Sequence, residues 1–151
     1  MSTLERAIEI AREAHAGQHD KAGKDYILHP VRVMKRGRTE EEKIAGVLHD
    51  VIEDSDWTFE MLEEEGFPSG VIEALRCVTK LSEDEDYDHF IARVLTNPQA
   101  MRVKLLDLED NMDLSRLEEC TEGDIRRLRK YRKACDRIKE SITVASAITE
   151  I

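Results

Sequence analysis

The sequence predicts an all-α protein, a compact bundle of about seven or eight helices. Only three prolines and seven glycines interrupt its 151 residues, which leaves long stretches that favour helices. Apolar residues recur at helical spacing along most of the chain, and no segment alternates convincingly with a period of two. Apolar residue types make up 40% of the sequence, so the chain can bury a core of useful size.

The first third of the sequence contains two expected helices and the loop between them. Ser2 and Glu5 form a capping-box pattern, and the apolar residues that follow lie on one face, so a first helix is expected there. The stretch 17–26 is polar, has two glycines and lacks periodicity, which is typical of a loop. His29-Pro30 then predicts the start of a short second helix, because proline suits a first helical turn.

The remaining helices are expected where a capping residue or a proline precedes an apolar run. A helix that opens at Thr39 is expected to run through Val51. The others are expected to begin at or near Thr58, Pro68 or Ser69, Asp84, Asn97 and Thr121. No repeat, linker or low-complexity segment divides the chain, so residues 1–151 are expected to form a single domain.

Charge and cysteine usage limit the class of protein. The sequence has 23 basic and 33 acidic residues, a net charge of −10, which argues against nucleic acid or an anionic membrane as the main partner. No apolar run approaches the length that spans a bilayer, and the N-terminus lacks the features of a secretory signal. Three cysteines without a Cys-x-x-Cys spacing indicate a reducing, cytoplasmic setting.

A basic run at residues 126–133 is the one feature that suggests nucleic-acid binding. It lies on a predicted helix that begins with Glu122 and Asp124, in a chain whose net charge is negative. Pairing with the protein's own acids, or a contact between subunits of a homo-oligomer, is therefore favoured over nucleic acid.

The segment from His49 to Asp54 places one imidazole and three carboxylates in an otherwise apolar helix. Neighbouring helix positions are about 100° apart, so His49, Asp50, Glu53 and Asp54 are expected to share one sector of it. Such a group needs a counter-charge, which a divalent cation would supply. Taken alone, the helix slightly favours another interpretation, in which His49 is a hydrogen-bonded core residue and Glu53 and Asp54 are solvated acids.

Two further residues, His29 and Asp107, are candidate site residues because each is a polar side chain in an apolar segment. His29 stands in an apolar segment at a helix start, where it is either a ligand or a capping or core histidine. Asp107 has leucines on both sides, so its carboxylate is expected to point inward and to need a partner. Lys104 and Asn111 lie one turn before and after Asp107, and a Lys104–Asp107 surface pair is the simpler alternative.

In this order and spacing, the segments resemble the HD superfamily of metal-dependent phosphohydrolases, and more narrowly the hydrolase domain of the RelA/SpoT family. The resemblance spans about residues 7 to 117 and implies the multi-helix HD-domain bundle. The matching segments are Ala14–Gln18, Lys21–Pro30, Ala45–Ser55, Val78–Lys80 and Val103–Met112.

The resemblance implies a role for each of nine residues. The implied metal ligands are His29, His49, Asp50 and Asp107, a set of two imidazoles and two carboxylates that suits Mn²⁺. Glu53 and Asp54 are implied to position or activate the attacking water. The implied contacts to a nucleotide are Lys21, Lys104 and Asn111.

The function that the resemblance implies is a Mn²⁺-dependent phosphohydrolase acting on a nucleotide. Removal of the 3′-pyrophosphate from (p)ppGpp-like compounds is the expected chemistry. A phosphomonoesterase on another nucleotide and a non-catalytic HD-type binding or regulatory module are the alternatives. A chain of 151 residues is too short for a synthetase domain as well, so pyrophosphate transfer from ATP to GTP is not expected.

Two segments depart from the family. Asp20 stands where the family often has an arginine, and in the stretch Leu108–Asp110 a leucine and two acids replace a segment in which the family has a basic and an imidazole group. If these acids face the substrate pocket, they repel phosphates and weaken the recognition of guanosine tetraphosphate.

Overall fold

The computed structural model describes residues 3–117 and 119–149, and in this part of the chain the regular elements are all helices. An isolated β-bridge joins His19 and Asp25. The all-α prediction is confirmed, with one short helix, α4, of a single turn. The elements are α1 (Leu4–Ala14), α2 (Leu28–Lys35), α3 (Glu40–Leu48), α4 (Val51–Asp54), α5 (Phe59–Glu64), α6 (Ser69–Val78), α7 (Tyr87–Val94), α8 (Pro98–Asn111), the 3₁₀ turn η1 (Leu114–Arg116) and α9 (Glu122–Thr149).

The helix starts follow the side chains that can cap them. The hydroxyls of Thr39 and Thr58 and the side-chain oxygen of Asn97 accept backbone N–H groups at the starts of α3, α5 and α8, as predicted. Thr121 and Asp124 cap α9 reciprocally, each accepting the other's backbone N–H.

Two predicted starts differ from the structure. Thr3 caps α1, and Ser2 lies outside the described residues. The helix expected from Asp84 begins at Tyr87, because Asp86 accepts the backbone N–H of His89 and so fixes the first turn there.

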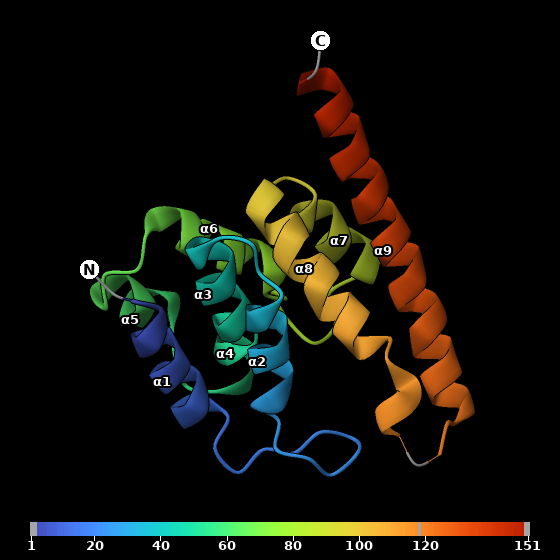
Figure 1. The fold of residues 1–151 in the computed structure, drawn as a ribbon, viewed down its shortest axis with the longest axis horizontal. Helices are drawn as coiled ribbons and strands as arrows, with labels where there is room; N and C mark the ends of the chain where they lie inside the picture. The colour runs from blue at the N-terminus through green and yellow to red at the C-terminus, as the bar shows by residue number, and fades with distance from the viewer. Residues whose placement is uncertain (1–2, 118, 150–151) are drawn as a thin grey trace.

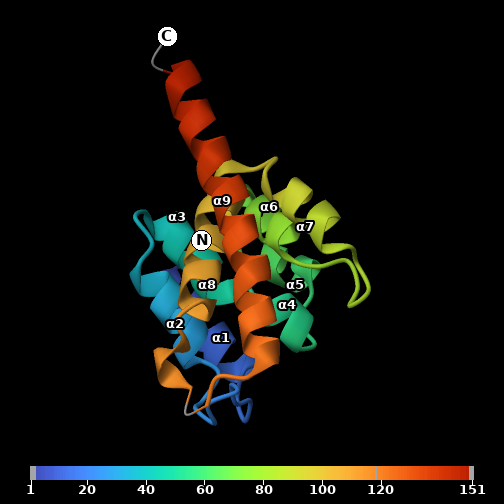
Figure 2. The ribbon, with the colours of Figure 1, turned by 90° about the vertical axis from the view of Figure 1, so that its right-hand side faces the viewer.

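The centre of the bundle is α3, which packs against α1, α2, α6 and α8 (Figure 1). Every residue from Ile44 to Leu48 is buried, because a helix surrounded by other helices must be apolar on all sides. The last helix, α9, lies along α8, and its C-terminal end extends past the body of the molecule (Figures 1 and 2).

The helix expected to run through Val51 is interrupted, so this prediction is wrong. α3 ends at Leu48 and α4 begins at Val51, with His49 and Asp50 in the turn between them. The Nδ1 atom of His49 lies 2.6 Å from the carbonyl oxygen of Gly46, which would accept the amide of Asp50 in a continuous helix. The imidazole of His49 therefore occupies a carbonyl oxygen that a backbone N–H group would otherwise bind, and the helix breaks at His49 and Asp50.

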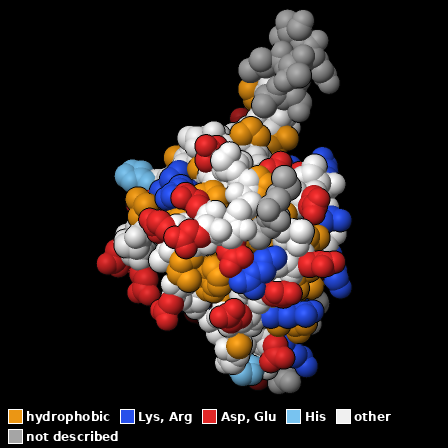
Figure 3. All heavy atoms as spheres, turned by 90° about the vertical axis from the view of Figure 1, so that its left-hand side faces the viewer, with side chains coloured by type: hydrophobic (Ala, Val, Ile, Leu, Met, Phe, Trp, Pro, Cys, Tyr) orange, Lys and Arg blue, Asp and Glu red, His pale blue; other side chains and the backbone are white. Residues whose placement is uncertain are grey.

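The molecular surface carries charges of both signs. The face with α1 and α5 shows acidic and basic side chains next to one another, so this face has no continuous basic area (Figure 3). Within the described residues, none of the helices is both long enough and apolar enough to cross a membrane.

Candidate metal centre and adjoining cavity

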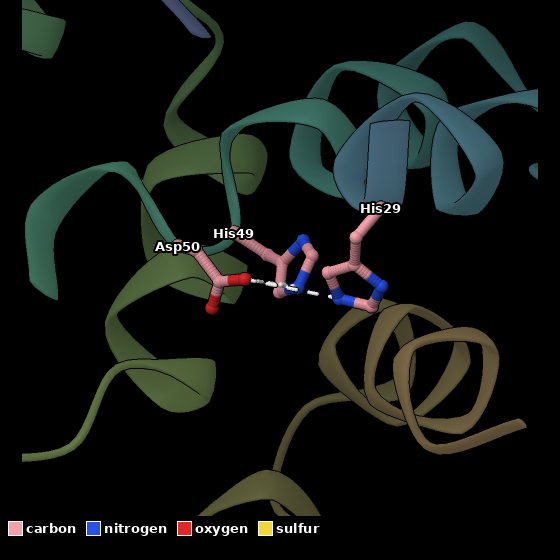
Figure 4. Close-up of side chains that lie close together, drawn as sticks. All are labelled: His29, His49 and Asp50. Carbon is pink, nitrogen blue, oxygen red and sulfur yellow. Dashed lines mark ion pairs between the residues drawn. The ribbon is translucent and has the colours of Figure 1, made fainter. Parts of the chain in front are cut away.

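Three side chains from two parts of the chain point toward one another (Figure 4). His29 comes from α2, and His49 and Asp50 come from the turn between α3 and α4. One possible ligand atom of each lies within 4.8 Å of the others. The Nε2 atoms of His49 and His29 stand 3.0 and 3.8 Å from Asp50 Oδ2.

Asp107, from α8, completes the group. Its Oδ1 atom lies 2.8 Å from Nε2 of His29 and 3.2 Å from Nε2 of His49. His29, His49 and Asp107 are 4%, 3% and 5% exposed, so Asp107 points inward as its leucine neighbours predict. The structure thus brings together all four residues expected as metal ligands.

The orientation of both imidazoles fits a bound cation. His49 donates its Nδ1 proton to the carbonyl of Gly46, and Nδ1 of His29 lies 2.6 Å from a carboxylate oxygen of Asp110. These bonds turn the Nε2 atoms toward Asp50 and Asp107. Two imidazole nitrogens with two carboxylates are a donor set suited to a first-row divalent cation. Metal-binding histidines usually have a carboxylate or a backbone carbonyl as the hydrogen-bond partner of the other ring nitrogen, as both histidines do here.

The protonation of the cluster shows why it needs positive charge. Burial lowers the pKa of the His49 imidazole, but the carboxylates of Asp50 and Asp107 outweigh it and raise that pKa well above its usual value. Burial raises the pKa of Asp50, yet the charge and hydrogen bond of His49 lower it to about 2. Protons on the imidazoles thus balance the carboxylates, and a divalent cation could replace them.

The hydroxyl of Tyr26 donates a hydrogen bond to Asp50 Oδ2, a contact that the sequence analysis did not identify. Tyr26 lies three residues before His29, in the same matching segment. The position of the Tyr26 phenol, close to the histidine that opens a helix, was therefore the sequence signal that could have indicated this contact.

Glu53 and Asp54 lie on the exposed side of α4, next to this cluster. Glu53 accepts the backbone N–H of Lys80 at 2.5 Å, and the carbonyl of Asp54 accepts the Gln18 side-chain amide at 2.8 Å. Partial desolvation, followed by the charges of Asp50 and Glu53, raises the pKa of Asp54 to about 6.

A cavity of about 410 Å³ adjoins the cluster, with His29 in its wall. Lys21 and Asn111, both expected to contact a nucleotide, also line it. Three arginines that the sequence analysis did not assign to the site, Arg32, Arg116 and Arg127, line the cavity as well. They come from α2, η1 and α9, elements that only the fold brings together.

Lys104 is the expected substrate contact that the structure places elsewhere. Its side chain is 13% exposed, and its Nζ atom lies 2.9 Å from Asp107 Oδ2 and 5.0 Å from the centre of the Phe90 ring. It is not among the residues of the cavity wall. Lys104 therefore neutralises Asp107 from within the core, so the Lys104–Asp107 pair exists but is buried.

Asp110 and Glu109 do not face the cavity as free acids, so the condition for repelling a phosphate is not met by either. Asp110 is buried between His29, Arg32 and Arg116. Glu109 accepts a hydrogen bond of 2.8 Å from Arg36. Arginine partners thus compensate both charges.

Asp20 does line the cavity, but its carboxylate forms hydrogen bonds within its own loop. Its Oδ1 atom accepts the backbone N–H groups of Ala22 and Lys24, both at 2.9 Å, and so holds the tip of the loop.

The basic run on α9 is partly used within the chain. Arg127 pairs with Asp124, and the Nζ atom of Lys130 lies 4.1 Å from the centre of the Tyr87 ring. The expectation for this run was pairing with the protein's own acids or a contact between subunits, and Arg127 makes such an acid pair, whereas Lys130 contacts an aromatic ring.

Comparison with known proteins identifies relatives among guanosine polyphosphate enzymes. The chain is 35% identical over 118 residues to a protein of Aquifex aeolicus, and 36% identical over 121 residues to one of Vibrio cholerae, each named guanosine-3′,5′-bis(diphosphate) 3′-pyrophosphohydrolase. Each match covers 73% of this chain and 17% of the relative. The chain is homologous to the SpoT/RelA proteins. The chain spans only about a sixth of the length of these curated relatives.

Two further comparisons extend this relation to SpoT. The bifunctional (p)ppGpp synthase/hydrolase SpoT of Escherichia coli is 33% identical over 118 residues, which are 71% of this chain and 17% of that protein. A solved structure, described as a metazoan orthologue of SpoT that hydrolyses ppGpp and plays a role in starvation responses, superposes with a TM-score of 0.78 at 24% identity. It covers 93% of this chain and 88% of its own, which shows that the two chains share one fold. No family model matches this chain.

Proposed function

We propose that this chain is a metal-dependent phosphohydrolase that removes the 3′-pyrophosphate from (p)ppGpp-like nucleotides. The observation that carries the proposal is the convergence of two imidazole Nε2 atoms with Asp50 and Asp107 beside a cavity of about 410 Å³. The names of the relatives support the same reaction.

The four converging residues, His29, His49, Asp50 and Asp107, would hold the cation, and Mn²⁺ suits their mixture of nitrogen and oxygen donors. When bound, the cation supplies a Lewis acid and lowers the pKa of water at the reacting phosphorus.

Glu53 and Asp54 would take the proton from the attacking water. Both lie on the turn of helix that follows Asp50, with their carboxylates on the exposed side. A general base works best when its pKa is near the working pH, and the pKa of Asp54, at about 6, approaches neutrality. The hydrogen bond from the Lys80 amide fixes the carboxylate of Glu53, which makes Glu53 the better group to orient the water.

The nucleotide would occupy the cavity, where Lys21 and Asn111 contact it. Arg116 and Arg127 line the same cavity, but they already pair with Asp113 and Asp124. Within the described ranges, Lys21 has no carboxylate at ion-pairing distance, so its charge is available for a phosphate.

Further proposals concern the setting of this enzyme. Residues 1–151 act as one domain, and the reaction takes place in the cytoplasm on a small nucleotide rather than on nucleic acid or at a membrane. The exposed part of the basic run on α9 is the proposed contact in a homo-oligomer.

The test is a release assay on protein freed of metal by a chelator and then supplied with Mn²⁺. Guanosine tetraphosphate, its adenine counterpart and simple nucleoside monophosphates are compared, and phosphate and pyrophosphate are measured separately. Pyrophosphate release from guanosine tetraphosphate that requires Mn²⁺ and is lost in His49→Ala is the expected result. Release of phosphate alone indicates a phosphomonoesterase, and nucleotide binding without release indicates a non-catalytic module. Either result contradicts the proposal.

A further inference from the structure

Asp110 stands directly behind one of the proposed metal ligands. It follows Asp107 by three residues on α8, so the two carboxylates share a helix face. The Oδ2 atom of Asp110 lies 2.6 Å from Nδ1 of His29, on the edge of the ring that faces away from the proposed metal position. Its side chain is 8% exposed.

Two arginines hold the Asp110 carboxylate in place. Arg32 donates from Nε to Oδ1 at 2.8 Å and from Nη2 to Oδ2 at 3.0 Å, a two-pronged contact that fixes the carboxylate plane. Arg116 donates to the backbone carbonyl of Asp110 at 2.8 Å and stands 3.5 Å from Oδ2. The two guanidinium groups thus give the buried Asp110 carboxylate a positively charged environment.

The two imidazoles of the site are anchored by different means. His49 donates to a backbone carbonyl, that of Gly46, whereas His29 has a side-chain carboxylate as its partner. A carboxylate that accepts the Nδ1 proton makes the other nitrogen more basic and fixes which nitrogen faces a cation. The anchor of His29 can therefore be removed by substitution, while that of His49 cannot.

We propose that Asp110 is a positioning residue that fixes the Nδ1-protonated form of His29 and so directs Nε2 to a divalent cation. The inference rests on the proposed metal centre and adds a residue to it.

The first test measures the affinity for Mn²⁺ alone by calorimetry, on metal-free wild-type, Asp110→Ala and Asp110→Asn proteins. Loss of such an anchor typically weakens metal binding about 10- to 100-fold, which is the expectation for Asp110→Ala. Asp110→Asn keeps an oxygen that can accept the Nδ1 proton but loses the charge, so a smaller loss is expected. Glu109→Gln, one residue earlier on α8 and bound to Arg36 at the surface, is the matched control and should bind as wild type does.

The second test separates positioning from a purely structural role. Histidine-selective ¹⁵N NMR of the protein with Zn²⁺, a diamagnetic substitute, reports which nitrogen carries the proton. In Asp110→Ala, the His29 signals should lose the single Nδ1-protonated form, while those of His49 should stay unchanged because Gly46 still anchors that ring. Signals that change equally at both histidines would indicate general loosening of the site and would overturn the proposal.

The outcomes distinguish this inference from the proposed function. Wild-type protein that binds no divalent cation overturns the metal centre and this inference together. Wild-type binding with Asp110→Ala and Asp110→Asn unchanged overturns the inference alone. If Asp110→Ala does not fold, Asp110→Asn decides, because the amide has the same shape: weaker Mn²⁺ binding than Glu109→Gln supports the proposal, and equal binding rejects it.

Discussion

The metal-facing side of the site and the wall of its cavity are built from different kinds of structure. His29, His49 and Asp107 are buried on helices or at a helix end, and each is held by at least two hydrogen bonds or ion pairs. Lys21 and Arg116, on the cavity side, lie in a loop and in a 3₁₀ turn that are more exposed.

In the proposed reaction, this difference would separate the chemistry from the choice of substrate. Side chains locked by packing and by bonds keep one geometry, which a reaction at a fixed point requires. Loop side chains can be exchanged or moved at little cost to the fold, which suits the recognition of a particular nucleotide. Substitutions on the two sides should therefore affect different measured quantities.

The largest effect is expected from Asp107→Ala. The change removes a proposed ligand that contacts both imidazoles and leaves the Lys104 ammonium buried without its partner. Mn²⁺ binding and turnover should fall together, by at least about a hundredfold. Calorimetry and the pyrophosphate assay on the same samples measure both. Full turnover in this variant would mean that the cluster is not the reaction centre.

A separation of metal binding from turnover is expected for Glu53→Gln and Asp54→Asn. The amides retain the size of the side chains but cannot accept a proton, and loss of a general base typically costs about 10²- to 10⁴-fold in kcat. Mn²⁺ affinity should stay close to wild type, because neither residue is a proposed ligand. The water-activation assignment fails if each variant keeps near-normal kcat.

The two lysines of the site offer the most direct comparison. Lys21→Met should raise KM about tenfold by removing one charged contact to phosphate, with kcat and stability little changed. Lys104→Met should leave KM in place and destabilise the metal-free protein, since breaking a buried pair costs about 3 kcal/mol, or roughly 6–12 °C in Tm for a chain of this size. Steady-state kinetics and thermal unfolding measure the two effects. A KM effect at Lys104 would place it at the substrate after all.

The smallest effect is expected at Asp20. Asp20→Arg would supply the cation that the family often has, but it removes the acceptor for two loop N–H groups. We expect KM for guanosine tetraphosphate to rise about two- to fivefold, because each lost loop bond is worth about 1 kcal/mol or less at the surface. Asp20→Asn keeps the acceptor and serves as the control. A lower KM in Asp20→Arg would show that the arginine outweighs the loop bonds.

Much of the fold was predictable because helix signals are local. Thr39, Thr58, Asn97 and Thr121 each cap a helix where the sequence predicts one, since a cap depends on residues within one turn. The break after Leu48 was not predictable in this way. The apolar spacing continues across it, and the bond from His49 to Gly46 competes with a backbone bond that the spacing cannot reveal.

The site was predictable in its ligand residues and less so in what surrounds them. Lys104, Asp107 and Asp110 share a face of α8, but spacing on a helix does not say whether a face meets a cavity or the core. Asp110 looks like a free acid in the sequence because its partner Arg32 stands 78 residues earlier. Partners at such separations depend on how helices dock, which local patterns do not contain.

The side chains of His29 and Asp107 meet across 78 residues of sequence. The proposed ligand set is thus complete only while α2 and α8 are docked, and a cation that binds this docked form alone stabilises it. At a hundredfold excess over its dissociation constant, that gain is about 2.7 kcal/mol. Metal supply in the cell would then control the lifetime of the protein as well as the proposed turnover, because a shortage would leave more chains open to proteases.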